Sequence, residues 1–481
     1  MLLKRLHDEP LAQTAWLVGC QATGTALIVD PNRDVQAVMA SAAAEGMRIT
    51  HVTETHIHAD FISGARDLAR ITGATLLLSD EGGDDWRYAY REEPNVRRLK
   101  DGDAFMVGNL RFDVMHTPGH TPEHLSFVLT DTPASDQPIG VFTGDFVFVG
   151  DVGRPDLLER AAHVADTMDD AARTLYASLR RFKTLPDWLQ LWPGHGAGSA
   201  CGKALGAVPS STLGYERIVN WGLRAPSEAA FVAEVLAGQP EPPAYFAHMK
   251  RLNRDGAPRL DVLPVAPALP PFALADALES GAAVVDIRPG DSFAAHHVPG
   301  TIALPYGRSF STYAGSVIPF GTPIYLVADG ARAASVPKAV RDLSIIGYER
   351  VIGVFGDDAL EAWARAGRPM AHLGAVSVAD AAREVERGAA VFLDVRKSSE
   401  WAEGHVAGAT LVPLPELLAR LTDVPRDQPV IVHCQGGGRS MTALSVLAHH
   451  GFTNVRNLTG GFGAWREAGL PVETGAPVSA R

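Results

Sequence analysis

Three things are scarce in this sequence: cysteine, long apolar runs and runs of basic residues. The three cysteines, Cys20, Cys201 and Cys434, are too few and too far apart for a disulfide framework, which fits a reducing cytoplasm. No apolar run is long enough to cross a membrane, and the N-terminal stretch lacks the apolar core of a signal peptide, so we expect a cytoplasmic protein. A net charge of −12 without a basic run argues against a nucleic-acid partner, but it permits a small anionic substrate bound by a local arginine.

Length is what the chain has in abundance. Its 481 residues are too many for one hydrophobic core, so we expect about two to four domains. Residues 1–245 form the first predicted domain. Residues 246–270 are rich in proline and are predicted to be a semi-rigid linker.

The first predicted domain mixes strand and helix patterns. Residues 15–20 and 25–30 read as paired strands, and residues 103–115 alternate around a turn as a hairpin does. Apolar residues at helical spacing in 31–46 and a buried strand at 75–79 interrupt this pattern. We therefore predict the α/β class and an αββα sandwich, in which two mixed sheets pack together with helices outside.

The rest of the chain contains an internal repeat. Residues 283–288 match 391–396, residues 297–301 match 405–409, and residues 347–351 match 451–455. Apolar strands alternate with amphipathic helices, which predicts βα units and a parallel sheet in each copy. We place the two copies at residues 271–370 and 375–475.

A candidate metal motif stands where a β-branched strand gives way to a helix. His56, His58 and Asp60 occupy alternate positions there. Because residues i and i+2 of an extended chain point to the same face, the two histidines can reach one ion. Imidazole and carboxylate suit zinc or iron. The alternative is that these three polar residues lie on a solvent-exposed loop and bind no metal. Further ligand-type residues elsewhere in the sequence would argue against that alternative.

Three later strand ends supply such ligands. His120 follows Thr-Pro-Gly, Asp145 follows Thr-Gly, and His195 follows Trp-Pro-Gly, each beside a glycine that lets the backbone approach closely. A lone Pro-Gly-His usually marks a buried, hydrogen-bonded histidine. Four such stretches in succession predict a shared metal site.

In this order the motifs resemble those of the metallo-β-lactamase superfamily, over about half of the chain, and the most similar subgroup is the persulfide dioxygenases. The resemblance implies one Fe(II) per chain, held by His56, His120 and Asp145. Hydrolytic members usually place a further histidine after the aspartate, where this chain has Phe61, and a phenyl ring cannot bind a metal. One metal with open positions is favoured, as O2 activation by two histidines and one carboxylate requires.

The remaining polar residues of these motifs are predicted to be auxiliary. Asp60 and His195 alone would make a weak second metal site, and His58 is either a weak fourth ligand or a residue that orients the ligands. By the same resemblance, Cys201 is either a thiol that handles persulfide near the iron or a buried, inert cysteine. Arg154 either binds a carboxylate of a thiol substrate or forms a structural pair with Asp156.

A second candidate site lies near the end of the repeat. Cys434 follows an apolar strand and precedes a helix, with Gly436, Gly437, Gly438 and Arg439 after it. Uncovered backbone N–H groups at such a turn stabilise a thiolate, a persulfide or an oxyanion of sulfur. The alternative is a glycine-rich turn with a core cysteine.

This last unit resembles rhodanese, the sulfurtransferase domain, and the Cys434-to-Arg439 spacing is the shorter, sulfur-type one rather than the phosphatase one. The resemblance implies that Cys434 carries sulfane sulfur. In the preceding copy Ala328 replaces the cysteine and the loop is shorter, so we interpret that copy as an inactive rhodanese-like domain.

Together these resemblances imply a persulfide dioxygenase fused to an inactive and an active rhodanese domain. The expected partners are a low-molecular-weight thiol persulfide such as that of glutathione, O2, and sulfite or thiosulfate, with no nucleic acid and no membrane; a homo-oligomer is compatible with the sequence. The enzymatic rival is a zinc thioester hydrolase of the glyoxalase II kind with a fused sulfurtransferase. The non-enzymatic rival is a persulfide carrier or sensor with a structural metal.

Overall fold

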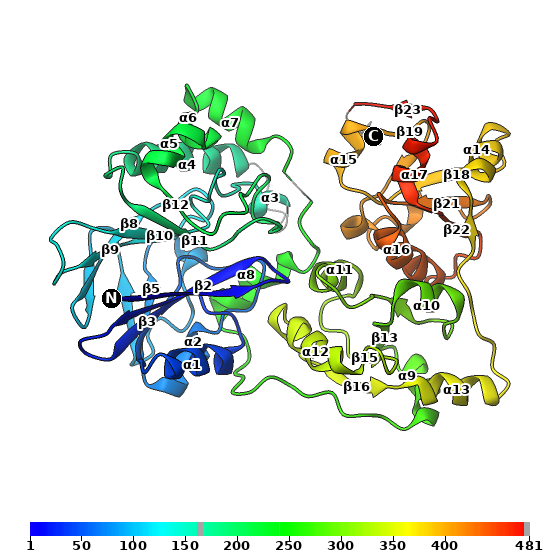
Figure 1. Ribbon diagram of the computed structural model, residues 1–481, viewed down its shortest axis with the longest axis horizontal. Coiled ribbons are helices and arrows are strands. Elements are labelled where there is room, and N and C mark those ends of the chain that lie inside the picture. Colours follow the sequence, from blue (N-terminus) through cyan, green and yellow to red (C-terminus); the bar gives the residue numbers. More distant parts are fainter. Residues whose placement is uncertain (161–166, 240, 476–481) are drawn as a thin grey trace. The chain divides into compact units, whose positions relative to one another are not determined.

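The computed structural model describes residues 1–160, 167–239 and 241–475, and the chain divides into two compact units, Met1–Leu263 and Pro264–Arg481. Each unit is described by itself below (Figure 1). Within these described ranges, no helix is both long and apolar enough to cross a membrane.

The first unit contains two mixed six-stranded sheets. In spatial order, the first sheet consists of β1 (Leu2–Asp8), β2 (Gln13–Cys20), β3 (Thr25–Val29), β4 (Arg48–Thr53), β5 (Thr75–Ser79) and β6 (Val96–Leu99). The second sheet consists of β12 (Ser211–Thr212), β11 (Gln190–Pro193), β10 (Gly140–Gly144), β9 (Leu125–Asp131), β8 (Leu110–His116) and β7 (Ala104–Val107). The predicted sandwich of two mixed sheets is confirmed.

The helices of this unit lie mainly on the two outer sides of the sandwich (Figure 1). They are α1 (Val35–Ala44), α2 (Ala65–Thr72), the 3-10 helix η1 (Asp84–Trp86), α3 (Leu157–Arg160), α4 (Met168–Phe182), α5 (Leu213–Val219), α6 (Trp221–Arg224), α7 (Glu228–Leu236) and α8 (Phe246–Asp255). α1 and α2 pack on the first sheet, and α4 and α7 on the second. The carboxylate of Asp34 caps the start of α1 by accepting a hydrogen bond from the backbone N–H of Ala37.

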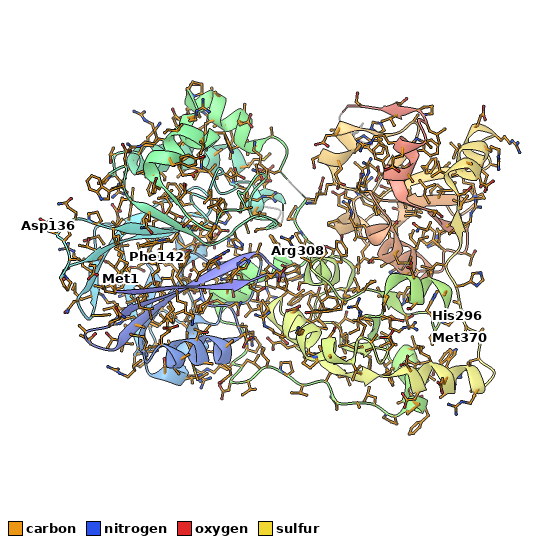
Figure 2. The ribbon with its side chains drawn as sticks, in the orientation of Figure 1. Met1, Asp136, Phe142, His296, Arg308 and Met370 are labelled. Atoms are coloured by element: carbon orange, nitrogen blue, oxygen red, sulfur yellow. The ribbon has the colours of Figure 1, made fainter. Side chains whose placement is uncertain are left out.

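The central core lies between the two sheets. It combines aliphatic and aromatic side chains, and the aromatic ones with no exposed surface are Phe112, Phe127 and Phe142, the last labelled in Figure 2. A core of this kind fixes the two sheets against each other, because a fully buried aromatic side chain contributes about 2–3 kcal/mol. The strand ends that carry the candidate ligands are therefore held on a rigid frame.

The predicted linker begins later than the proline content suggested. Residues 246–255, assigned to the linker from sequence, form helix α8 and belong to the first unit. Phe246, Met249 and Asn253 recur on one face of that helix and are buried. The composition of the whole segment hid this short amphipathic pattern, and only the residues after it have the proline-rich character of a linker.

The second unit contains two parallel sheets, as the repeat predicted, and one short antiparallel pair. The first copy has the order β14 (Ile302–Ala303), β13 (Ala283–Asp286), β15 (Ile324–Val327) and β16 (Val351–Phe355). The second copy has the order β17 (Ala375–Val376), β22 (Val455–Leu458), β21 (Val430–His433), β18 (Val391–Asp394) and β20 (Thr410–Leu411). The short pair is β19 (His405–Val406) with β23 (Val472–Glu473).

Helices connect these parallel strands. In the first copy they are η2 (Pro271–Ala273), α9 (Leu274–Glu279), α10 (Gly290–Ala295), α11 (Phe310–Val317), η3 (Ala333–Ser335), α12 (Val336–Ile345) and α13 (Asp357–Arg365). In the second copy they are α14 (Val378–Glu386), α15 (Ser398–Glu403), η4 (Leu414–Glu416), η5 (Leu421–Asp423), α16 (Gly438–His449) and α17 (Gly461–Glu467).

The two copies contact each other along α16. The hydroxyl of Ser445 accepts a hydrogen bond from the backbone N–H of Ala303 at 2.9 Å, and the ring of His449 bonds the carbonyl oxygen of Gly300 at 2.8 Å. Because α16 begins in the Cys434 loop, the copy without a cysteine packs against the helix that follows the cysteine of the other.

Candidate metal centre and sulfur-transfer loop

Each candidate metal ligand follows the end of a strand. His56 lies just beyond β4, and its neighbour Thr55 is held by Asp30, whose carboxylate accepts hydrogen bonds from the backbone N–H of Thr55 at 2.6 Å and from its hydroxyl at 2.9 Å. Asp145 follows Gly144 at the end of β10. Gly144 has φ = +49°, and a Cβ there would meet the hydroxyl oxygen of Thr55 at 2.3 Å, so only glycine lets these two strand ends approach.

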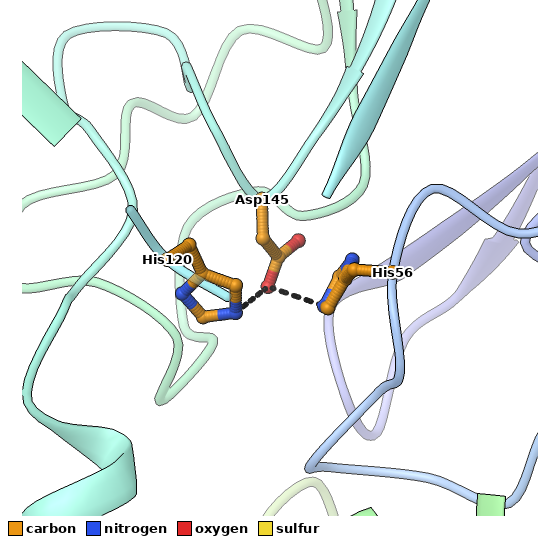
Figure 3. A group of neighbouring side chains, drawn as sticks. All are labelled: His56, His120 and Asp145. Carbon is orange, nitrogen blue, oxygen red and sulfur yellow. Dashed lines mark ion pairs between the residues drawn. The ribbon is translucent and has the colours of Figure 1, made fainter. Parts of the chain in front are cut away.

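His56, His120 and Asp145 are brought together from three separate strand ends (Figure 3). Their donor atoms all lie within 4.8 Å of one another, and all three residues are buried. The Oδ2 atom of Asp145 lies 3.9 Å from Nε2 of His56 and 3.7 Å from Nε2 of His120. Both distances are less than twice a metal–ligand bond of about 2.1 Å, so one ion can bind all three atoms.

The protonation of these side chains fits a cation. Nδ1 of His120 bonds the carbonyl oxygen of Arg154 at 2.9 Å, which leaves Nε2 to face the site. Burial lowers the pKa of His120 to about 4, and burial with the neighbouring imidazoles holds the pKa of His56 well below its usual value, so both rings are neutral. Burial raises the pKa of Asp145 to about 6, and its Oδ2 accepts no hydrogen bond from any described residue. A buried carboxylate oxygen without a donor is costly, and a bound metal ion supplies the missing partner.

His58 is not one of the three grouped residues, although its ring centre lies 4.2 Å from that of His56. Its Nε2 pairs with Asp30 Oδ1 at 3.2 Å, and although burial opposes protonation, the carboxylate raises the pKa of His58 to about 9. The ring of Phe61 stacks on that imidazole at 4.3 Å and is itself fully buried. One ring nitrogen of His58 is thus paired with Asp30, and a phenyl ring stands where the resemblance would put a further ligand.

Asp60, His195 and Cys201 form a second buried group. Nε2 of His195 lies 3.3 Å from Oδ2 of Asp60 and 3.6 Å from Oδ1 of Asp145, so this group adjoins the triad. Burial, with the two nearby carboxylates, raises the pKa of the Cys201 thiol well above its usual value. Cys201 therefore lies beside the centre as a neutral thiol in the absence of a cation.

Arg154 is engaged in a salt bridge inside the protein. Its Nε and Nη2 donate to the two carboxylate oxygens of Asp156 at 2.8 and 2.7 Å, and its Nη1 donates to the carbonyl oxygen of Ala200 at 3.0 Å. Both charged side chains have no exposed surface. This geometry agrees with the second of the two roles considered for Arg154, a structural pair with Asp156.

Three positioning residues escaped sequence reasoning. Nε2 of His124 accepts a hydrogen bond from the backbone N–H of Asp145 at 3.2 Å. From α8, Asn253 donates to the carbonyl oxygens of His58 and Phe61, both at 2.8 Å, and accepts from the backbone N–H of Ser63 at 2.9 Å. The hydroxyl of Tyr245, just before α8, donates to the carbonyl oxygen of Asp60 at 2.7 Å. His124 had a local signal, four residues after His120, whereas the other two lie 185–195 residues from their partners.

The Cys434 loop directs one backbone N–H group at the sulfur. The backbone N–H of Gly437 donates to Sγ of Cys434 at 3.1 Å, and the hydroxyl of Ser440 lies 3.7 Å from the same sulfur. Gly437 has φ = +115°, which a residue with a side chain rarely adopts, and no protein atom lies within 4 Å of a Cβ placed there. The loop therefore presents its backbone to open space while directing an N–H group at the sulfur.

Both copies border this loop. A pocket of about 550 Å3 is lined by Gly436, Gly437 and Gly438 and, from the preceding copy, by Pro289 and Asp291, among others. The guanidinium of Arg439 pairs through both terminal nitrogens with the carboxylate of Glu400 on α15. The loop thus opens into a pocket that the copy lacking a cysteine helps to form.

In the equivalent loop of the first copy, aspartate side chains accept hydrogen bonds from the backbone. The carboxylate of Asp329 accepts a hydrogen bond from the backbone N–H of Arg332 at 2.9 Å, and that of Asp357 accepts one from the backbone N–H of Gly330 at 2.9 Å. Ala328, which replaces the cysteine, is buried. Two backbone N–H groups of this loop, those of Gly330 and Arg332, are therefore already bonded to side chains.

Two family matches agree with this division. Residues 8–195 match the metallo-beta-lactamase superfamily and residues 377–468 match the rhodanese-like domain. The chain is also similar to the crystal structure of a metallo-beta-lactamase from Staphylococcus aureus, with 39% identity and a TM-score of 0.66, over 74% of this chain and 99% of that one.

Three curated relatives match one part or the other. The first half is 28% identical to persulfide dioxygenase ETHE1 of Bos taurus, over 40% of this chain and 68% of that protein. It is 29% identical to a hydroxyacylglutathione hydrolase of Rhodospirillum rubrum, over 37% of this chain and 60% of that protein. The last part is 37% identical to thiosulfate sulfurtransferase 16 of Arabidopsis thaliana, over 17% of this chain and 78% of that protein. The chain spans about half the length of the first curated relatives it matches.

Proposed function

Since the chain belongs to the metallo-β-lactamase superfamily and carries a C-terminal rhodanese domain, we propose that it oxidises a low-molecular-weight thiol persulfide with O2 and exchanges sulfane sulfur with sulfite or thiosulfate. The observation that carries this proposal is the triad of His56, His120 and Asp145, with Phe61 stacked on the neighbouring His58. Two imidazoles and one carboxylate leave open positions on a single ion, as oxygen-activating iron sites require.

The first reaction converts the outer sulfur of a persulfide, with O2 and water, into sulfite and releases the thiol. Bound Fe(II) supplies the redox chemistry that brings O2 and sulfur together, which zinc lacks. His56, His120 and Asp145 would hold that ion, while His124 accepts a hydrogen bond from the backbone N–H of Asp145 and so positions it. The neighbouring buried thiol of Cys201 supports a role for that side chain in handling the sulfur.

The second reaction is a sulfur transfer at Cys434. The thiolate attacks the outer sulfur of thiosulfate, a sulfur–sulfur bond forms as the original one breaks, and sulfite leaves with the electron pair. The reverse reaction joins sulfane sulfur to sulfite. The N–H of Gly437 stabilises the negative charge on sulfur in both directions.

The test begins with protein purified without oxygen. Metal analysis should find about one iron per chain and little zinc, and O2 uptake should follow the addition of glutathione persulfide. His56→Ala should abolish O2 uptake and leave sulfur transfer from thiosulfate intact, whereas Cys434→Ser should do the opposite. Zinc in place of iron, with no O2 uptake, would refute the dioxygenase half.

The similarity to hydroxyacylglutathione hydrolase makes a zinc thioester hydrolase the rival function. Phe61 argues against it, because a phenyl ring fills the place of the further ligand that a dinuclear centre uses. The zinc-loaded protein should therefore hydrolyse a glutathione thioester no faster than its His56→Ala variant. A rate that depends on both zinc and His56 would favour the rival.

A further inference from the structure

A pocket in the first unit opens beside the triad. It has a volume of about 400 Å3, and its lining includes His120 and Gly119 from the metal-binding loop, Trp86, Lys250 from α8, and the carboxylates of Asp85 and Asp170. A pocket that includes a candidate ligand of the metal is the natural place for the organic part of a substrate whose sulfur reaches that metal.

An anionic substrate needs a cation in this pocket, and Arg154 cannot supply it. Its guanidinium bonds both oxygens of Asp156 and the carbonyl oxygen of Ala200, and it has no exposed surface. Releasing it would leave a buried carboxylate without its partner, which is strongly destabilising.

Lys250 is the cation that the pocket presents. Its Nζ lies 3.8 Å from the centre of the Trp86 ring, and it makes no hydrogen bond or ion pair with any residue in the described ranges. Burial lowers the pKa of Lys250, and Arg254 acts in the same direction, while Glu123 and Asp85 oppose the shift. A half-buried ammonium group without an acceptor is prepared to take an anion from a ligand.

The position of Lys250 is fixed relative to the metal-binding loop. Asn253, on the same helix, bonds the backbone of His58, Phe61 and Ser63, all at 2.8–2.9 Å. Tyr245 adds a further hydrogen bond to the backbone of that loop. α8 therefore sets the separation between the cation and the ion-binding side chains, as a specificity site requires.

We propose that Lys250 binds the carboxylate of the thiol persulfide and makes the enzyme selective for thiols derived from amino acids. This rests on the proposed function for the reaction itself. Asp85 and Asp170 line the same pocket and repel extra negative charge, so the favoured substrate carries an ammonium group as well as the carboxylate. A thiol with several phosphate groups is disfavoured.

The kinetic test uses the full iron-loaded chain and compares Lys250→Gln with Lys250→Arg and with Arg251→Gln, which alters an exposed cation on the same helix. Lys250→Gln should raise KM for glutathione persulfide at least about tenfold, with kcat nearly unchanged, because a charge-assisted hydrogen bond is lost in ground and transition state alike. Lys250→Arg should recover most of the affinity, and Arg251→Gln should match the wild type. The persulfide of glutathione dimethyl ester, which lacks both carboxylates, should show the same KM with wild type and Lys250→Gln.

A binding measurement separates this inference from the proposed reaction. S-methylglutathione cannot be oxidised as a persulfide, and its affinity, measured by calorimetry, should fall at least about tenfold in Lys250→Gln but not in Arg251→Gln. S-methyl-coenzyme A should bind the wild type more weakly than S-methylglutathione. If S-methylglutathione binding depends on Lys250 while no persulfide supports O2 uptake, the Lys250 site stands and the dioxygenase reaction falls. Equal affinity in wild type and Lys250→Gln, or a fall in kcat without a change in KM, overturns the role of Lys250.

Discussion

The two rhodanese-like copies share a scaffold and differ in one loop. In each, an aspartate at the end of one strand, β13 in the first copy and β18 in the second, bonds the arginine two residues later at 2.7 Å: Asp286 with Arg288, and Asp394 with Arg396. In each, a histidine stacks on an aromatic ring four residues earlier, at 4.0 Å in one copy and 3.7 Å in the other. The loops after β15 and β21 then diverge, because one is bonded to its own carboxylates and the other surrounds a thiol.

The comparison of the two copies separates the residues that maintain the fold from the loop that performs sulfur transfer. The buried aspartate–arginine pair satisfies backbone and side-chain groups at the edge of the sheet and survives in both copies. The backbone N–H groups of the loop form an anion site only where no side chain of the protein already accepts them. A copy can therefore lose sulfur transfer and still pack beside the active copy.

The largest effect should come from the thiol itself. Cys434→Ser should reduce sulfur transfer from thiosulfate to cyanide at least about a thousandfold, because the nucleophile is lost while the loop backbone stays in place. The rate of thiocyanate formation measures this. Substantial transfer by the variant would mean that another cysteine carries the sulfur, and Cys201→Ser in the same background would identify it.

The next effect tests whether the two scaffolds are equivalent. Asp394→Asn and Asp286→Asn each leave a buried guanidinium without its carboxylate, so each should lower the free energy of unfolding of its copy by about 3 kcal/mol. Hydrogen exchange of β18 and β13 reports the two copies separately. A large loss in only one copy would show that the shared geometry does not have a shared role.

Glu400 offers a smaller difference between the copies, since Ser292 stands at its place in the first copy. Burial alone would raise the pKa of Glu400, but the ion pair with Arg439 holds it below its usual value. A lowered pKa in the folded state means that the pair stabilises the protein above the unfolded pKa near 4.5 and loses that effect as the pH falls through the folded pKa.

Glu400→Gln should therefore cost about 1 kcal/mol at pH 7, and this difference from the wild type should shrink below pH 4.5. Urea denaturation of both proteins across this range measures it. A difference that is constant with pH would show that the cost of the substitution is lost packing rather than lost charge.

The smallest expected effect is no effect. Ala328→Cys, placed in the Cys434→Ser background, should not restore sulfur transfer, because the carboxylates of Asp329 and Asp357 already accept two N–H groups of that loop and would repel an anion there. The control is Cys434→Ser alone in the same assay. Transfer clearly above that background would show that the thiol alone distinguishes the two copies.

The sandwich, the repeat and the triad could be predicted from the sequence for a common reason: each depends on patterns within short segments of the chain. Strand ends followed by a ligand-type residue are local patterns, and four of them converge because β4 of the first sheet and β8, β10 and β11 of the second end close together in the sandwich. The pairing of His58 with Asp30 was not predictable in the same way, because it depends on how β3 and β4 lie side by side. Neither was Cys201 beside Asp60, which requires the fold to bring the two together.

Helix α8 was missed because its signal is both short and remote. Its buried positions cover only three turns, inside a segment whose proline content dominates. Its partner is a loop almost 200 residues earlier, and no pattern in one sequence connects the two. The role of this helix in holding the loop of residues 58–63 is recognised only from the hydrogen bonds of Asn253.

These hydrogen bonds bear on how such a protein can be cut or recombined. The superfamily match ends at residue 195, yet the loop that carries His58 and Asp60 is fastened by a helix at residues 246–255. A gene fragment limited to residues 8–195 would encode the candidate ligands but not the helix whose hydrogen bonds hold their loop. A fragment designed to keep this metal centre intact should therefore extend through residue 255, just before the proline-rich linker, rather than stop at residue 195.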